Sequence, residues 1–98
     1  MLLAFSITPL GTGDSVSGAV AEAVRIVRAS GLPNETNAMF TNVEGSWDEL
    51  MDLLRRCVEA VAEQAPRVSV VAKIDYRPGF EHQLRHKVEA IEEQLDER

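Results

Sequence analysis

Two short polar segments of this sequence carry side chains that could bind a small molecule. The six side chains are those of Asn37, Thr41, Glu44, Lys73, Asp75 and Arg77. Both segments fall in stretches that predict strands of one small sheet, so these groups could converge. Buried polar groups need partners, either one another or a ligand. Spacing alone leaves a second interpretation open, in which they are solvated strand ends joined by one salt bridge.

A glycine-containing loop is the second candidate for binding. Gly11-Thr12-Gly13 lies between a predicted strand and a predicted helix, where backbone amides can hold an anion. The lysine of a nucleotide-binding P-loop and the third glycine of a dinucleotide fingerprint are both missing from it. The loop is therefore either a plain turn or one wall of a ligand pocket.

Catalytic and metal-binding patterns are weak. Ser15 and Ser17 have no evident histidine base in the sequence. His82 and His86 are four residues apart, a spacing that lets two imidazoles on one helix meet one metal ion. Arg85 stands between them and would oppose a cation, which favours surface polar residues instead. The chain therefore predicts a binding protein more readily than an enzyme.

The first elements expected are a strand and a helix. Apolar side chains alternate over residues 2–9, and the strand is expected to end at Pro9, which cannot donate to a sheet. The helix that follows has Asp14 or Ser15 as its N-cap. Its C-terminal end is predicted at Gly31, because glycine tolerates positive φ.

The middle of the chain predicts two short strands and a second helix. Residues 34–44 are mixed and polar, which indicates two strands with a tight connection around residues 38–41; one long strand is the competing interpretation. Ser46 and Glu49 form a capping box at the start of the helix. Its buried stripe is expected to comprise Leu50, Leu53, Leu54, Cys57, Val58 and Val61.

The C-terminal part predicts a strand and a third helix. Residues 67–76 alternate regularly and form the strongest strand pattern of the chain. The last helix is expected from about Glu81 onwards, and its charged surface is broken only by a narrow apolar seam. The seam consists of Leu84, Val88, Ile91 and Leu95. So thin a stripe is typical of a helix that packs against a partner, in its own domain or in another subunit.

The order strand-helix-strand-strand-helix-strand predicts the ferredoxin-like βαββαβ sandwich, an α+β fold. Two helices would cover one face of a four-stranded antiparallel sheet, with the added helix at the C-terminus and residues 1–98 forming one domain. The other face would stay open, and a second subunit packed on it could enclose a polar pocket. Residues expected on the open face are Ala4, Ser6, Thr8, Ser69, Val71 and Lys73.

Composition narrows the class of partner. The net charge of −6 argues against nucleic acid, which requires clustered Lys and Arg. No apolar run reaches the length of a membrane span, and the first five residues lack the basic start of a signal peptide, so a cytoplasmic protein is expected. Cys57 lies in an apolar stripe and is expected to act as a small buried hydrophobe.

Three segments together resemble the thiamine-binding protein family of small ferredoxin-like domains. They are Ile7-Thr8-Pro9-Leu10-Gly11-Thr12-Gly13 with Ser15-Val16-Ser17, Met39-Phe40-Thr41-Asn42-Val43-Glu44-Gly45 with Trp47-Asp48-Glu49-Leu50-Met51, and Lys73-Ile74-Asp75-Tyr76-Arg77. Their order and separations fit as well, so the resemblance spans nearly the whole chain.

The resemblance implies binding of thiamine or its hydroxymethylpyrimidine part without catalysis, with no further cofactor and no metal. It also implies dimers formed sheet to sheet and tetramers formed as pairs of dimers. Phe40 stands where relatives often have glycine, and it would narrow a pocket or stack on an aromatic ring. The ligand-binding residues that the resemblance implies are Thr8, Leu10, Gly11, Ser17, Asn37, Met39, Thr41, Glu44, Lys73, Asp75 and Arg77.

The chemistry of such a ligand suggests roles for a few of these residues. An aminopyrimidine offers an amine donor and ring-nitrogen acceptors, which suit Glu44 together with a hydroxyl such as that of Thr41. The thiazolium cation would favour a carboxylate from Asp75 or Glu44, and Phe5, Phe40 or Tyr76 could add a cation–π contact.

The sequence therefore leaves three functional classes open. A thiamine-type binding module is favoured by the resemblance. A homo-oligomeric structural or regulatory protein without a ligand would account for the seam helix and the open sheet. An enzyme comes third, because fold does not fix function and no pair of nucleophile and base is evident.

Overall fold

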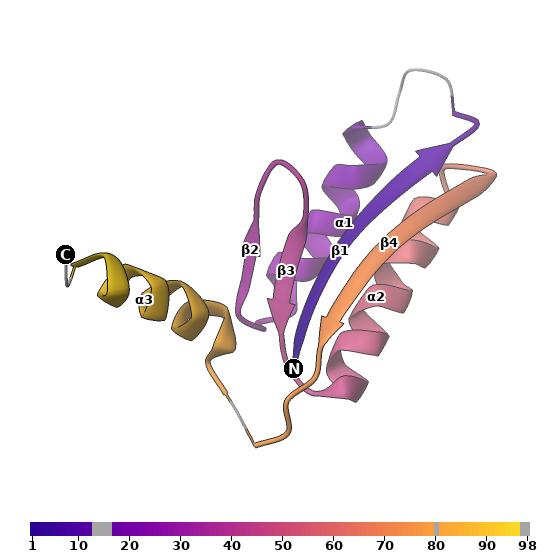
Figure 1. Cartoon of the computed structure of the whole chain (residues 1–98). Helices are drawn as coiled ribbons and strands as arrows, with labels where there is room; N and C mark the ends of the chain where they lie inside the picture. Colours follow the sequence, from indigo (N-terminus) through magenta and orange to yellow (C-terminus); the bar gives the residue numbers. More distant parts are fainter. Residues whose placement is uncertain (13–16, 80, 97–98) are drawn as a thin grey trace.

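The computed structural model describes residues 1–12, 17–79 and 81–96. In chain order its elements are β1 (Leu2–Leu10), α1 (Ser17–Ala29), β2 (Asn34–Thr36), β3 (Thr41–Glu44), α2 (Trp47–Ala62), β4 (Arg67–Asp75) and α3 (Gln83–Asp96). The antiparallel sheet has the strand order β2-β3-β1-β4, and α1 and α2 lie side by side against it (Figure 1). The predicted ferredoxin-like fold with an added C-terminal helix is confirmed. None of the three helices is long and apolar enough to cross a membrane, within the residues described.

The hydrophobic core lies between the sheet and the two packed helices. Every second residue of β1 points into it, and the stripe of α2 closes it from the other side because its apolar residues recur at helical spacing. Cys57 is fully buried there, as predicted, and burial raises the pKa of its thiol to about 11. The buried members are Leu3, Phe5, Ile7, Ala19, Ala23, Val27, Val43, Leu50, Leu53, Cys57 and Val61.

The register of the sheet defines its open face. Ala4 lies between Asn42 of β3 and Lys73 of β4, while Ser6 pairs with Val71. Neighbours in register share a face, and the alternate residues of β1 are buried under the helices, so these side chains point away from the core. The predicted membership of the open face is thereby confirmed.

The first strand corrects one prediction. β1 does not end at Pro9; Pro9 is paired with Val68 and buried, and the strand continues to Leu10. β3 pairs only with residues 2–5 of β1, so no described strand pairs with the later part of β1 on that side. Proline is tolerated at such an edge, because no neighbouring strand requires its missing N–H.

Several turns and helix ends predicted from local sequence signals are present in the described residues. Two short strands are present, and residues 37–40 connect them: the Asn37 side chain accepts hydrogen bonds from the amides of Met39 and Phe40, at 2.9 Å each. The Ser46–Glu49 capping box is present in full. Gly31 follows α1 with φ of 78°, as expected of a residue beyond a helix end. The predicted cap of α1, Asp14 or Ser15, lies outside the described residues.

The third helix leaves the body of the domain (Figure 1). It begins at Gln83 rather than near Glu81, and His82 precedes it in the left-handed region with φ of 58°. His82 therefore lies outside α3, so the two histidines are not both on one helix, as a shared metal ion at that spacing would require. Three of the four seam residues are largely exposed: Val88, Ile91 and Leu95 at 53%, 62% and 60%.

Candidate functional site

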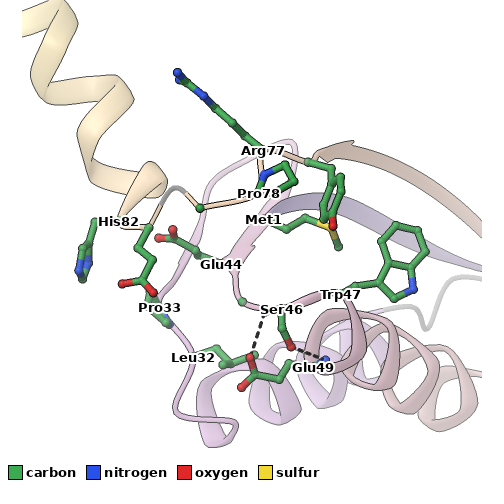
Figure 2. A pocket seen from close by; sticks show the side chains of 14 residues that line it. Met1, Leu32, Pro33, Glu44, Ser46, Trp47, Glu49, Arg77, Pro78 and His82 are labelled. Carbon is green, nitrogen blue, oxygen red and sulfur yellow. Dashed lines mark hydrogen bonds between the residues drawn. The ribbon is translucent and has the colours of Figure 1, made fainter.

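A cavity of about 550 Å³ opens where β3 ends and α2 begins (Figure 2). Its other walls are the end of β4 and the segment that leads into α3. Backbone hydrogen bonds fix this rim: the amide of Gly45 donates to the carbonyl of Met1 at 3.1 Å, and the amide of Glu44 to that of Pro33 at 2.9 Å. Pockets for small ligands usually measure about 300–1,000 Å³, so the cavity can hold one.

Two aromatic side chains form one wall of the cavity. Trp47 is the first residue of α2 and Tyr76 follows β4; their rings meet edge to face, with centroids 6.3 Å apart and an interplanar angle of 85°. Both rings remain exposed, Trp47 at 51% and Tyr76 at 63%. An exposed aromatic wall beside carboxylates can stack on a heteroaromatic ring and attract a cation.

Carboxylates line the same cavity. The Glu49 carboxylate accepts a hydrogen bond from the backbone amide of Ser46 at 3.0 Å. The backbone amide of Glu49 in turn donates to the Ser46 hydroxyl. The bond to the Ser46 backbone, followed by that to its side chain, holds the pKa of Glu49 below its usual value. Glu44 and Glu81 add two further carboxyl groups to the lining. The capping box thus supplies a fixed negative charge to the cavity.

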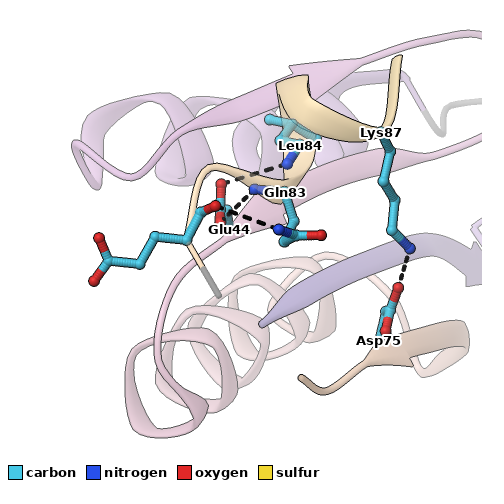
Figure 3. A network of polar contacts seen from close by, with 6 residues as sticks. Glu44, Asp75, Gln83, Leu84 and Lys87 are labelled. Atoms are coloured by element: carbon cyan, nitrogen blue, oxygen red, sulfur yellow. Dashed lines mark hydrogen bonds and ion pairs between the residues drawn. The ribbon is translucent and has the colours of Figure 1, made fainter. Parts of the chain in front are cut away.

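Glu44 is the buried carboxylate of the site, at 8% exposure. Its two oxygens accept hydrogen bonds from the backbone amides of Gln83 at 2.8 Å and Leu84 at 3.4 Å (Figure 3). These amides belong to the first turn of α3, where helix N–H groups have no partner within the helix and favour negative charge. Glu44 therefore fastens α3 to the sheet while it lines the cavity.

A second attachment of α3 lies beside the first. Lys87 forms an ion pair with Asp75 at the end of β4 (Figure 3). The hydrogen bond from Lys87, and then its charge, hold the pKa of Asp75 below its usual value. Under this turn of α3 a smaller hollow of about 160 Å³ reaches Lys73 and Leu84 on the open face. Asp75 and Lys73 are thus next to the main cavity but do not line it.

The charge balance of the main cavity is negative. Arg77 belongs to the lining, but its side chain extends away from the cavity (Figure 2). His82 also lines the cavity. Three carboxyl groups thus line the cavity, whereas the Arg77 side chain points away from it. Such a site favours a cationic ligand over an anionic one.

The polar set predicted around residues 37–44 does not converge. Thr41 is buried on the helix-facing side of the sheet, 3.5 Å from the hydroxyl of Thr36, whereas Glu44 lies on the opposite side. Asn37 holds the turn between β2 and β3, and Met39 beside it is 73% exposed. Of the six polar residues first considered, the cavity brings together only Glu44 and Arg77.

The glycine-loop residues form a separate group at the other end of β1. Thr8 pairs with Ser69, six positions along the strand from Leu2, which pairs with Glu44. At about 3.3 Å per residue, this separates Thr8 from the cavity by about 20 Å. Leu10 and Gly11 follow at the strand end, and Ser17 opens α1. Neither of the two described cavities that Glu44 lines is lined by any of these residues.

Gly11 has a structural role that its spacing did not reveal. Its φ is 83°, and a Cβ at this position would lie 2.7 Å from Cγ of Pro66. The turn therefore needs glycine both for its backbone conformation and for the close approach of the next loop. The plain-turn interpretation of Gly11 has a physical basis in this contact.

Several residues of the cavity were absent from the sequence-based set. The sequence pattern does not predict a binding role for Trp47, Met1, Leu32 or Pro33, all of which line the cavity. A tryptophan at the first position of an amphipathic helix, off its apolar stripe, was the signal that could have drawn attention to this end of the sheet. No cluster of three His, Cys, Asp or Glu side chains suited to a metal ion occurs in residues 1–12, 17–79 and 81–96.

Comparison with known proteins gives the chain a family. The model of the family described as thiamine-binding protein matches residues 3–92. The UPF0045 protein Mb1933 of Mycobacterium bovis is 54% identical over 96 residues, which cover 97% of this chain and 94% of that protein. The UPF0045 protein MJ1052 of Methanocaldococcus jannaschii is 39% identical over 88 residues, covering 90% and 88%.

Solved structures agree with this assignment. The crystal structure of MJ1052 matches with a TM-score of 0.84 at 37% identity and covers 94% of this chain and 95% of that one. A domain of unknown function, DUF77, from Bacillus cereus matches with a TM-score of 0.81 at 33% identity, covering 89% and 85%. The fold and the sequence therefore lead to the same conclusion: the chain belongs to the thiamine-binding protein family.

Proposed function

We propose that this protein binds thiamine, or its hydroxymethylpyrimidine part, without catalysis, as a homo-oligomer in the cytoplasm. The observation that carries the proposal is the meeting of the Trp47–Tyr76 pair and the Glu44 carboxylate in one cavity of about 550 Å³. The family description supports the same ligand class.

The cavity complements both rings of thiamine. The thiazolium carries a permanent positive charge, which the aromatic faces and the carboxylates of Glu44 and Glu49 attract. The aminopyrimidine is neutral and planar, so it can stack on Trp47 or Tyr76 and donate its amine to a carboxylate. The second lone pairs of the Glu44 oxygens remain suited to that hydrogen bond.

The homo-oligomer is part of the proposal because one chain leaves binding residues far apart. Thr8 is about 20 Å from the cavity along β1, and Leu10 and Gly11 are farther still, beyond it at the other end of the strand. A second chain packed antiparallel on the open sheet face would bring its far end next to the cavity of the first. In that arrangement both groups of expected residues could contact one ligand, as either a dimer or a tetramer.

A second candidate function is an interaction protein that assembles without a ligand. The observation that favours it is the exposure of Val88, Ile91 and Leu95 on α3, which points to a protein partner rather than a small molecule. The two candidates make different predictions for a titration with thiamine, because only the first requires saturable binding.

Isothermal titration of the dialysed protein with thiamine, and separately with hydroxymethylpyrimidine, tests the proposal. Trp47 is the sole tryptophan of the chain, so its fluorescence reports directly on the aromatic wall. We expect saturable heat, a change in Trp47 emission, and at least tenfold weaker binding by Tyr76→Ala. Thr8→Ala, at the far end of β1, separates a cavity within one chain from a site shared between two, because it should weaken binding only if the site is shared.

The outcomes discriminate between the candidates. If folded, ligand-free protein gives neither heat nor a fluorescence change with both compounds, the ligand proposal fails and the interaction protein is favoured. If Tyr76→Ala binds as tightly as the wild type while Thr8→Ala does not, the ligand stands but the cavity at Trp47 is the wrong place.

A further inference from the structure

We infer that α3 is a self-pairing helix, which docks antiparallel on α3 of a second copy of this chain. The inference rests on the homo-oligomer of the proposed function and adds the surface and the orientation of one contact. The first observation is that Val88, Ile91 and Leu95 lie on one face of α3 and are 53–62% exposed. Leu84, the first seam residue, already packs against the sheet of its own domain.

The spacing of the seam suits two helices packed side by side. Its members follow one another at intervals of four, three and four residues, the repeat that keeps a narrow apolar stripe facing a partner helix. The spacing of the seam is the same when it is counted from either end. In an antiparallel pair Val88 of one copy therefore contacts Ile91 of the other. A two-fold axis between them makes the contact self-complementary, as closed homodimers require.

The charges of α3 favour the antiparallel orientation. The first turns are basic and the later turns acidic, so opposite signs face each other when the second helix runs the other way. In a parallel pair, charges of the same sign would lie beside each other along most of the length, except that Lys87 would lie next to Glu92. The basic residues are Arg85 and Lys87, and the acidic residues, which all follow them, are Glu89, Glu92, Glu93 and Asp96.

Two flanking positions make the orientation testable. Arg85 directly follows Leu84 and Glu92 directly follows Ile91, so both flank the seam on the same side, and antiparallel helices bring these flanks together. The contact between Arg85 of one copy and Glu92 of the other then forms twice. A parallel pair would instead place Lys87 next to Glu92.

The ion pairs within the chain support this choice. Lys87 is already engaged by Asp75 of its own domain, which leaves it poorly placed for a parallel partner. In contrast, neither Arg85 nor Glu92 has an ion-pair partner among the residues that the structure describes. The groups that antiparallel pairing needs are therefore the ones that the isolated chain leaves available.

The antiparallel arrangement also enlarges the contact. A helix of 14 residues is about 21 Å long, and two such helices alone bury less than the ~1,200 Å² of a stable interface. Antiparallel pairing places Leu95 of one copy level with Leu84 of the other. Leu84 lies in the first turn of α3, which Glu44 holds against the sheet by hydrogen bonds. The end of each helix then reaches the open sheet face of the second copy, which adds buried surface.

The test is charge reversal in the full chain, followed by sedimentation over a range of concentrations. Arg85→Glu and Glu92→Arg should each raise the dissociation constant of self-association about tenfold, because each puts like charges together twice. The double variant should return to within about threefold of the wild type. Glu93→Arg, outside the seam flanks, is the control for net charge, and far-UV circular dichroism checks that α3 keeps its helicity.

The results separate this inference from the proposed function. If the double variant self-associates as weakly as Glu92→Arg alone, the helices pair in parallel through Lys87. If the single charge reversals have no effect on self-association, α3 is not in the interface. Either outcome overturns the inference. Ile91→Gln provides an independent test. It should weaken self-association because Ile91 lies in the seam, whereas Glu93→Gln should not. Thiamine titration of the same variants shows whether the ligand proposal survives separately.

Discussion

The carboxylate of Glu44, the last residue of β3, accepts a hydrogen bond of 2.8 Å from the backbone amide of Gln83, the first residue of α3. The same side chain lines the cavity that holds the Trp47–Tyr76 pair. The buried carboxylate of Glu44 therefore belongs both to the candidate ligand site and to the attachment of α3. A change at Glu44 must act on both, whereas a change at Tyr76 acts on the cavity alone.

The first prediction concerns this double role. Glu44→Ala should release the first turn of α3, because the amides of Gln83 and Leu84 lose their acceptor; losses of helix caps of this kind typically cost about 1 kcal/mol. Hydrogen exchange should become faster at these amides while the core strands stay protected. Thiamine binding should weaken in the same variant.

Glu44→Gln separates the two roles of the carboxylate. The amide side chain keeps one oxygen acceptor for α3 but removes the negative charge. Exchange at Gln83 should therefore stay closer to that of the wild type, while affinity for the thiazolium cation falls. Equal loss of helix protection in Glu44→Ala and Glu44→Gln would show that charge, rather than hydrogen bonding, holds α3 in place.

Local sequence signals were sufficient for the elements but not for their tertiary use. The Ser46–Glu49 capping box and the stripe of α2 depend on neighbours within a few turns, and both are present, although Leu54 and Val58 of the stripe are only partly buried. Proline at position 9 predicts the end of a strand, yet β1 continues past it, because β3 extends only as far as residue 5 of β1. That extent is a property of the assembled sheet, which the residues around Pro9 do not encode.

The candidate site was harder to predict because its parts meet only in the folded chain. Trp47 and Tyr76 belong to different elements, and the Glu44 contact with α3 joins residues 39 positions apart. One error could have been avoided. Thr41 and Glu44 are three residues apart in one strand, and alternation alone places them on opposite faces.

The second prediction is that the cavity discriminates against phosphorylated thiamine. A diphosphate adds negative charge to the ligand, while the lining presents Glu44, Glu49 and Glu81, and the Arg77 side chain points outward. We expect thiamine diphosphate to bind at least tenfold more weakly than thiamine in isothermal titrations at low salt, and the gap to narrow as salt screens the charges.

Glu49→Gln is the matched variant for this prediction. Glutamine also serves at this position of a capping box, so the start of α2 should remain intact while one negative charge is lost. The preference for thiamine over its diphosphate should shrink in Glu49→Gln. Tighter binding of the diphosphate by the wild type would mean that the ligand phosphates lie elsewhere, beyond the reach of these carboxylates.

The third prediction is an acid-dependent release of α3. The pKa of Asp75 is lowered in the folded protein, first by the hydrogen bond from Lys87 and then by its charge. The contribution of this pair is therefore fully present above the unfolded pKa of an aspartate, about 3.9, and is lost as the pH falls through the lower folded value. Carbon chemical shifts of α3 should report loosening of its first turns in this range.

Asp75→Asn tests whether the ion pair is responsible. The variant should show α3 loosened already at neutral pH, and the part of the acid transition that belongs to Asp75 should disappear. Glu35→Gln, an exposed carboxylate on β2, is the control for a general loss of negative charge. An unchanged acid transition in Asp75→Asn would transfer the effect to another carboxylate.

The last prediction distinguishes a structural from a binding role for the glycine loop. Gly11→Ala meets two penalties, a φ of 83° and a Cβ only 2.7 Å from Pro66, so it should lower the free energy of unfolding by about 1–3 kcal/mol. Gly31→Ala has a similar φ of 78° but no atom within 4 Å of its Cβ, so it isolates the backbone penalty of about 1 kcal/mol. Denaturant unfolding of both variants measures the difference. If Gly11 acts only in the turn, the folded fraction of Gly11→Ala should bind thiamine as the wild type does; normal stability with lost binding would instead assign Gly11 to the ligand.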